Sequence, residues 1–271
     1  MPTQVRALII TGYGLNCERE TACAFRQAGA QAEQVHLKDI LNGERSLSEY
    51  HILAFIGGFS FGDHLGAGTV FANRVRRRMR DDLEEFVDAG KLIIGICNGF
   101  QTLTRIGLVP GLDGIRFEPR VALAENTRGI FRDAWIEVAA EPASPCVFTR
   151  GLGRLPLPIR HGEGRFVADS PETMSKLEQQ NLVALRYVNP ATGEPAESFP
   201  HNPNGSQNAI AGICDPTGRI FGLMPHPEAY LSAYNHPHWQ RQQIDGTLPD
   251  HGLGLAIFEN AVNAVASSNV R

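Results

Sequence analysis

A cysteine between two glycines is the residue of this chain best suited to nucleophilic chemistry. Cys97 lies in the run Gly95-Ile-Cys-Asn-Gly99, a G-x-C-x-G pattern. This is the thiol counterpart of the G-x-S-x-G nucleophile elbow, where glycines allow a sharp turn between a strand and a helix. The helix N-terminus that follows would stabilise a thiolate, and the Asn98 amide would be free to bind an oxyanion. The pattern predicts a nucleophile, although a buried core cysteine fits the same residues.

A histidine held between two prolines is the predicted base for this thiol. His226 lies in Pro225-His-Pro-Glu228, directly after a predicted strand. The prolines fix the backbone around the ring, and Glu228 is close enough to orient it. His161, in His161-Gly-Glu-Gly-Arg165, has a glutamate at the same spacing, and the glycines around it suggest a loop near a ligand, so His161 is the alternative base. A rigid surface turn is the competing interpretation of the first motif.

The densest glycine stretch, residues 57–68, follows another predicted strand and should lie on the same rim as Cys97. It matches neither G-x-x-x-x-G-K-[ST] nor G-x-G-x-x-G, so nucleotide binding is not expected. We expect this stretch to form an oxyanion hole instead, because Gly58 would let Phe59 present its backbone N–H to a tetrahedral intermediate. A flexible surface loop remains the alternative.

Alternating β-rich and helix-forming segments must position these residues. Strands are predicted over 4–10, 51–56, 91–96, 182–188, 209–213 and 219–224, and helices over 18–28, 70–89, 99–106 and 253–266. Residues 116–170 predict antiparallel hairpins. The fold class is therefore α/β, a doubly wound and mostly parallel sheet flanked by helices, with an antiparallel insertion. Strand carboxyl ends gather on one side of such a sheet, so Cys97 and His226 can meet.

Composition excludes several classes of protein. The formal net charge of −4 argues against nucleic-acid binding, and no apolar run is long enough to suggest a membrane span. The first residues lack the pattern of a secretory leader. No repeat or long linker divides residues 1–271, which we expect to form a single domain.

The remaining cysteines and histidines indicate neither disulfides nor a metal. Five cysteines at irregular spacings make a poor disulfide framework, which favours the cytoplasm: Cys17, Cys23, Cys97, Cys146 and Cys214. Among them Cys17 is the second candidate nucleophile, because it follows a strand end and opens a helix. His236-Pro-His238 has no acidic or thiol ligand at a familiar spacing, so a solvated loop without a metal is expected.

Taken together, these motifs resemble the triad-type (class I) glutamine amidotransferases. Within that family the closest likeness is the glutaminase component of phosphoribosylformylglycinamidine synthase. The likeness rests on five stretches in the family's order: Gly14-Leu-Asn-Cys-Glu18, Gly57-Gly-Phe-Ser-Phe-Gly-Asp63, Gly95-Ile-Cys-Asn-Gly-Phe-Gln101, His161-Gly-Glu-Gly-Arg-Phe166 and Met224-Pro-His-Pro-Glu228.

The resemblance implies a role for each site residue. Cys97 would attack the side-chain amide of glutamine and form a thioester, while His226 would protonate the ammonia and Glu228 would orient His226. Two sets of residues complete the implied site: Phe59 and Asn98 as oxyanion donors, and Gly57, Gly58 and Gln101 as glutamine contacts.

The resemblance also implies a partner. Ammonia would pass to a separate synthetase that amidates formylglycinamide ribonucleotide in purine biosynthesis. ATP and Mg²⁺ belong to that partner and no cofactor to this chain, with a third small subunit left open. The polar insertions at 189–206 and 231–252 are longer than expected for a short free-standing subunit. Another amidotransferase's glutaminase, a non-glutamine cysteine hydrolase or chaperone-like protein of the same broad fold, and a non-catalytic scaffold are the rival interpretations.

Overall fold

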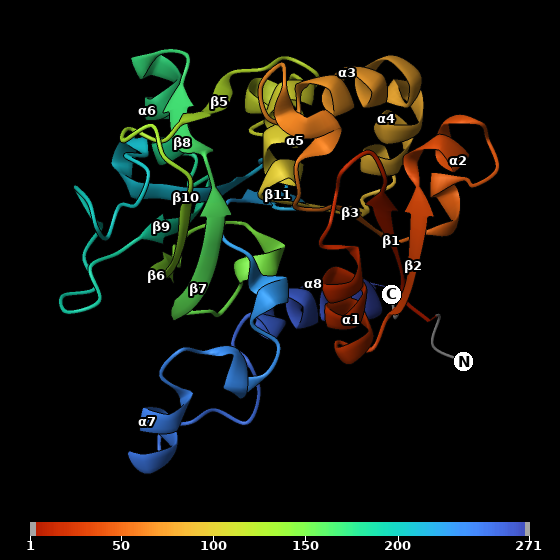
Figure 1. Cartoon of the computed structure of the whole chain (residues 1–271). Helices are drawn as coiled ribbons and strands as arrows, with labels where there is room; N and C mark the ends of the chain where they lie inside the picture. The colour runs from red at the N-terminus through yellow and green to blue at the C-terminus, as the bar shows by residue number, and fades with distance from the viewer. Residues whose placement is uncertain (1–3, 269–271) are drawn as a thin grey trace.

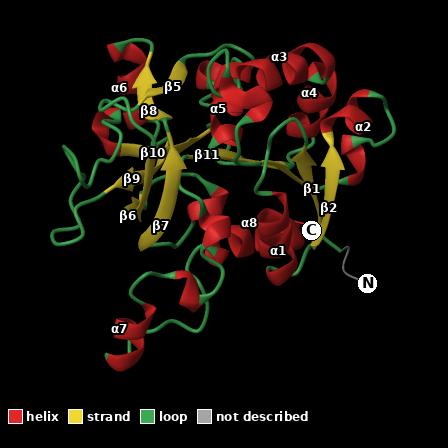
Figure 2. Cartoon of the chain, in the orientation of Figure 1, coloured by secondary structure: helices red, strands yellow, loops and turns green. Residues whose placement is uncertain are grey.

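One large sheet runs through the molecule (Figures 1 and 2). The computed structural model describes residues 4–268. The strands of this sheet are β1 (Arg6–Thr11), β2 (Gln31–His36), β3 (Ile52–Phe55), β4 (Leu92–Ile96), β6 (Arg132–Ala140), β7 (Arg154–His161), β9 (Val183–Tyr187), β10 (Ile210–Cys214) and β11 (Ile220–Leu223). Within the described part their order is β2-β1-β3-β4-β11-β10-β9-β6-β7.

The sheet has a parallel half and an antiparallel half. Strands β2, β1, β3, β4 and β11 pair in parallel, as the βαβ pattern of the sequence predicts. Strands β10, β9, β6 and β7 extend it with antiparallel pairings. The predicted α/β class and the antiparallel insertion are confirmed. The sheet is mixed in nearly equal parts rather than mostly parallel, because the later strands join the same sheet.

Helices cover both faces of the parallel half (Figure 1). One face carries α1 (Glu18–Gln27) and α8 (Leu255–Ser268), and the other carries α3 (Thr69–Arg78), α4 (Arg80–Asp88) and α5 (Asn98–Ile106). Phe25 and Phe258 pack edge to face at 5.0 Å and join α1 to α8. A short helix, α2 (Leu37–Leu41), follows β2 directly.

Two predicted elements differ from the structure. The helix expected over 70–89 breaks at Met79, whose φ of −128° and ψ of 15° leave the helical range. Its side chain is buried, and Asp81 and Asp82 stabilise the new helix N-terminus that follows. The His161–Arg165 stretch is not a loop. Instead β8 (Glu163–Ala168) pairs with β5 (Val121–Glu125) in a second, two-stranded sheet, and α6 (Pro171–Gln179) follows.

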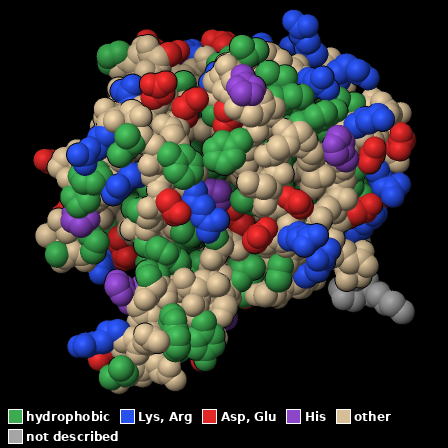
Figure 3. Space-filling model, in the orientation of Figure 1, with side chains coloured by type: hydrophobic (Ala, Val, Ile, Leu, Met, Phe, Trp, Pro, Cys, Tyr) green, Lys and Arg blue, Asp and Glu red, His purple; other side chains and the backbone are tan. Residues whose placement is uncertain are grey.

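The two long insertions lie outside the sheet. Residues 189–206 form a loop with one isolated bridge between Val188 and Pro195. Residues 231–252 contain α7 (Trp239–Ile244) and project from the body as a lobe (Figures 1 and 3). Tyr234 and Ile244 are largely exposed in this lobe. Among the described helices, none has the length and apolar character needed to span a membrane.

Candidate active site

Cys97 occupies a strained turn between β4 and α5. Its φ of 51° and ψ of −106° lie where residues with a side chain are rarely found. The flanking glycines are required by close packing, because a Cβ at Gly99 would overlap the carbonyl of Phe55 and one at Gly95 would meet Leu103. Strain of this kind persists only where the surroundings over-determine it, and it is frequent at reactive groups. The predicted elbow is therefore present.

The Cys97 thiol faces the hairpin strand β7. Its Sγ donates to the Arg160 carbonyl at 3.6 Å, and its backbone N–H donates to Leu223 on the neighbouring strand β11 at 2.8 Å. The residue is only 4% exposed. Although β7 is an edge strand in the sheet order, the hairpin brings its carboxyl end over the elbow.

His226 and Glu228 form a buried, hydrogen-bonded pair. His226 Nδ1 lies 2.6 Å from Glu228 Oε1, and the two residues are 3% and 2% exposed. The His226 backbone N–H donates to Pro158 on β7 at 2.8 Å, which anchors the turn to the strand that carries Arg160. Because a carboxylate accepts from Nδ1–H, Nε2 is the nitrogen left for proton transfer. Nε2 has no hydrogen-bond partner among the described residues.

Nearby negative charge makes this imidazole a strong base. Burial alone would disfavour the charged ring, but Glu228, Cys97 and Cys17 outweigh it and raise the pKa of His226 well above 6.5. No Cys97–His226 hydrogen bond forms in this structure, since the thiol donates to Arg160.

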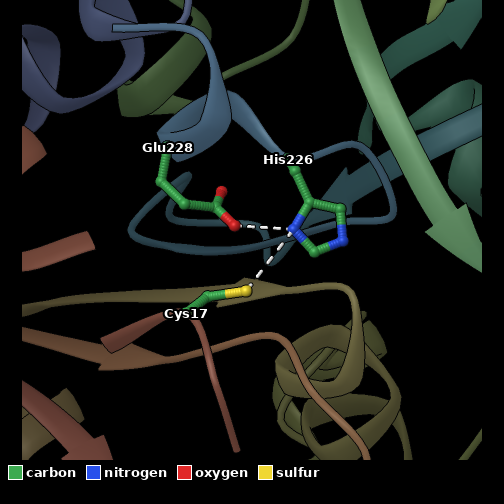
Figure 4. Close-up of side chains that lie close together, drawn as sticks. All are labelled: Cys17, His226 and Glu228. Carbon is green, nitrogen blue, oxygen red and sulfur yellow. Dashed lines mark hydrogen bonds and ion pairs between the residues drawn. The ribbon is translucent and has the colours of Figure 1, made fainter. Parts of the chain in front are cut away.

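Cys17, the second candidate nucleophile, also lies at His226. Its Sγ is 3.9 Å from His226 Nδ1 and shares that nitrogen with Glu228 (Figure 4). Burial raises the pKa of the Cys17 thiol, with a smaller lowering effect from the His226 contact. Cys17 precedes α1 with an ordinary φ of −108° and so lacks the elbow geometry of Cys97. Its position and protonation make it a poorer nucleophile.

The predicted oxyanion loop is built differently from expectation. The Phe59 N–H donates to the Gly14 carbonyl at 3.0 Å and is not free in this structure, because residues 14–16 and 57–59 pair as a short antiparallel bridge. The Asn98 N–H, at the start of α5, has no acceptor within the described residues, and neither has that of Gly58. Gly58 has a φ of 138°, and a Cβ there would meet Leu15.

The other predicted glutamine contacts are packed inside the protein. Gln101 Nε2 donates to the Glu163 carbonyl, and its Oε1 accepts from Asn98 Nδ2 at 2.9 Å. Asn98 Nδ2 also donates to Asp63 at 3.2 Å, which ties α5 to the glycine loop. A Cβ at Gly57 would lie 2.7 Å from His226 Cε1, so this glycine sits directly against the triad ring.

His161, the alternative base, is a neutral structural histidine. Burial is the main cause that lowers its pKa to about 3, with a further contribution from His226. Its Nδ1 bonds Asn126 Oδ1 at 3.1 Å, and its ring packs on Gly164. A group with this pKa is too weak a base to ionise a thiol at neutral pH.

The expectation for His236-Pro-His238 is partly wrong. His236 is buried and packs edge to face on Trp135 at 4.9 Å, whereas His238 is exposed. The His236 ring belongs to an aromatic cluster that covers β6, so this histidine has a packing role and is not part of a solvated loop. Sequence reasoning missed this because Trp135 and His236 are far apart in the chain.

Comparison with known proteins identifies the family. The model of the CobB/CobQ-like glutamine amidotransferase domain matches residues 4–265. The chain belongs to the class I glutamine amidotransferases. The resemblance predicted from the sequence is confirmed, and with it the enzymatic class.

Two relatives of this amidotransferase are named as subunits of the same synthase. The phosphoribosylformylglycinamidine synthase subunit PurQ of Methanococcus maripaludis is 44% identical over 95% of this chain and 96% of its own length. That of Dehalococcoides mccartyi is 43% identical over 96% and 97%. A solved structure of PurLQS from Thermotoga maritima matches with a TM-score of 0.70 and 28% identity, covering 97% of this chain and 100% of that one.

Proposed function

We propose that this amidotransferase is the glutaminase subunit of phosphoribosylformylglycinamidine synthase in purine biosynthesis. It hydrolyses glutamine to glutamate and ammonia. The observation that carries the proposal is the elbow cysteine on the same rim as the buried His226–Glu228 pair. Relatives that bear the synthase subunit name cover nearly the whole chain at 43–44% identity.

Cys97 opens the reaction. Its thiol rotates away from Arg160 and gives its proton to His226 Nε2 while the sulfur bonds to the amide carbon of glutamine. His226 then passes that proton to the leaving nitrogen, so ammonia departs and a γ-glutamyl thioester remains. Water attacks the thioester with His226 as base, releasing glutamate and the free thiol. Glu228 holds the Nδ1–H throughout and stabilises the imidazolium.

Backbone amides stabilise the oxyanion of each tetrahedral intermediate. We assign one amide to Asn98, which lies at the N-terminus of α5 with no acceptor in the described structure. Phe59 serves as the second donor only if its bond to Gly14 opens, whereas the free amide of Gly58 needs no such change. Loss of one such donor typically costs about 10²–10³ in rate.

The glutamine site lies beside this elbow. We place the substrate against Gly57 and Gly58, which present backbone without side chains next to His226. Gln101 acts less directly: its amide joins Asn98 to Glu163 on β8 and so shapes the wall of the site. Nε2 keeps a second hydrogen and Oε1 a second lone pair, so a direct contact between Gln101 and glutamine requires neither bond to open.

Ammonia is consumed by a synthetase partner in this proposal. Formylglycinamide ribonucleotide, ATP and Mg²⁺ bind to that partner, and the present chain carries no cofactor for the reaction. A third small subunit is compatible with the PurLQS relative. We place the complex in the cytoplasm, where a reduced Cys97 is maintained. Residues 1–271 act as one amidotransferase domain, since the nucleophile and the base sit on the same sheet.

Glutamate release tests the proposal. Wild type and Cys97→Ala are assayed with glutamine, each with and without the purified synthetase and its substrates. We expect release that depends on Cys97 and rises when the synthetase turns over. If folded and associated proteins release no glutamate under any of these conditions, the glutaminase assignment is wrong.

A further inference from the structure

Three potential metal ligands meet on the side of His226 that faces away from its free nitrogen. They are Cys17 Sγ, His226 Nδ1 and a Glu228 carboxylate oxygen, and these atoms all lie within 4.8 Å of one another (Figure 4). All three residues are buried. A thiolate, an imidazole and a carboxylate are the ligands that Zn²⁺ takes in proteins. This cluster was not predicted from the sequence, because Cys17 and His226 are 209 residues apart.

We propose that Cys17, His226 and Glu228 form a binding site for Zn²⁺, and that the bound ion holds the triad inactive. Binding itself does not depend on the proposed function. The inhibitory effect does rest on it, since it requires His226 to act as the base of the glutaminase.

The distances are close to those a tetrahedral zinc ion needs. Usual Zn–S, Zn–N and Zn–O lengths place sulfur about 3.6 Å from nitrogen, and nitrogen about 3.4 Å from oxygen. In the structure Cys17 Sγ lies 3.9 Å from His226 Nδ1, and Glu228 Oε1 lies 2.6 Å from the same nitrogen. The sulfur must approach by about 0.3 Å and the carboxylate must withdraw by about 0.8 Å.

Glu228 has an oxygen that the triad leaves unpaired. Its Oε2 is buried and has no hydrogen-bond partner among the described residues. Rotation of the carboxylate therefore breaks only the hydrogen bond that Oε1 accepts from His226 Nδ1. An orphaned buried carboxylate oxygen is costly, and a cation beside it removes that cost.

The backbone leaves space where the thiol and the ring meet. A Cβ at Gly57 would lie 3.1 Å from Cys17 Sγ as well as 2.7 Å from His226 Cε1. A glycine at this point keeps the two potential ligands open to each other. The remaining ligand position would be filled by solvent or by the second oxygen of Glu228.

Binding exchanges protons for the metal and involves no electron transfer. Zn²⁺ binds the Nδ1 lone pair of a neutral His226 ring, so the ring proton moves from Nδ1 to Nε2, and the ion takes the place of the Cys17 thiol proton, which is released. The ion then withdraws charge from the ring, and Glu228 no longer supports an imidazolium. Nε2 then carries the ring proton and has no lone pair to accept the proton of Cys97, so thioester formation slows. This differs from an ion bridging Cys97 and Nε2, which would need Cys97 as a ligand.

Cadmium titration of variants without Cys97 tests the site directly. Cd²⁺ serves as the probe because its bond to a thiolate absorbs in the ultraviolet. We compare full-length Cys97→Ala with Cys97→Ala/Cys17→Ser, and use Cys97→Ala/Cys23→Ser as the matched control for an exposed thiol. The expected result is that Cys17→Ser removes one equivalent of bound Cd²⁺ together with its band. Equal titrations of Cys97→Ala and Cys97→Ala/Cys17→Ser would overturn the proposal.

A second variant retains every thiol except Cys97, so its result does not depend on whether the Cys17→Ser variant folds. Glu228→Gln in the Cys97→Ala background should weaken Cd²⁺ binding at least about tenfold, since even outer-shell changes cost about 10–100-fold in metal affinity. Unchanged affinity, with a native circular dichroism spectrum, contradicts the assignment of Glu228 as a ligand.

Zinc inhibition tests the functional half separately. With glutaminase measured in the presence of the synthetase, Cys17→Ser should raise the half-inhibitory Zn²⁺ concentration roughly tenfold or more. Equal inhibition of wild type and Cys17→Ser would refute the inhibitory role. If wild type has no glutaminase activity, the proposed function fails, but the cadmium titration still decides whether the site exists.

Discussion

Gly57→Ala should disable the triad without disturbing the backbone. Gly57 has an ordinary φ, so alanine is allowed there, but its Cβ would lie 2.7 Å from His226 Cε1. Ordinary contact begins at 3.4 Å, so the imidazole must move by about 0.7 Å. A misplacement of about 1 Å costs about 10²-fold in rate. We therefore expect kcat for glutamate release to fall between about 10-fold and 10²-fold.

The assay is glutamate release with the synthetase present, and Gly153→Ala is the matched control. Gly153 also has an ordinary φ, and its Cβ would meet nothing within 4 Å, so that variant should retain wild-type kcat. If Gly57→Ala keeps kcat within about twofold of wild type while folded, the steric reasoning about His226 is wrong.

Two further predictions concern stability. Because the pKa of His226 is raised above 6.5, its stabilising effect is complete below pH 6.5 and is lost as pH rises through the folded-state value. Urea titrations give the free energy of unfolding of wild type and of His226→Asn, and the second is subtracted from the first. This difference should fall as the pH rises, by up to about 1.4 kcal/mol per pH unit. A difference that rises with pH would contradict the prediction. Glu163→Ala removes the acceptor of the Ala67 N–H and should lower that free energy by about 1–2 kcal/mol, whereas exposed Glu172→Ala should leave it nearly unchanged. Equal denaturation midpoints for these two variants would count against a role of Glu163 in holding the glycine loop.

The elbow was predictable because its signal is local. The glycines around Cys97 stand within two residues of it, and the backbone strain that they permit is fixed by the same short stretch. Strands β1, β3, β4 and β11 of the parallel half were predictable for a similar reason, since each has its own apolar run. Strand β2 (Gln31–His36) was not predicted, because Val35 is its one buried residue and the rest of the strand is polar or partly exposed. The predicted strands 51–56 and 91–96 differ from β3 (Ile52–Phe55) and β4 (Leu92–Ile96) by no more than one residue at either end.

Contacts between distant segments could not be predicted. Cys17 reaches His226 only because α1 packs against the turn that carries Glu228. The Phe59 amide is occupied because residues 14–16 happen to lie alongside the glycine loop. In both cases the contacting residues are distant in the sequence, so no local pattern predicts the contact.

Glycine was misleading at His161-Gly-Glu-Gly-Arg165. Two glycines suggested a loop, but β7 and β8 meet at this point. The ring of His161 occupies the space where a Cβ of Gly164 would lie, so that glycine serves packing rather than a turn. In the sequence, a glycine that a loop requires cannot be told from a glycine that close packing in a strand requires.

The most direct test of the triad is to locate the covalent intermediate. The chain and its synthetase are mixed with glutamine, quenched in acid during turnover and digested for mass spectrometry. The account predicts one glutamyl group on the peptide that contains Cys97, and none in Cys97→Ala. A glutamyl group on Cys17 instead of Cys97 would contradict the account. Glutamate release by Cys97→Ala at the wild-type rate would also contradict it.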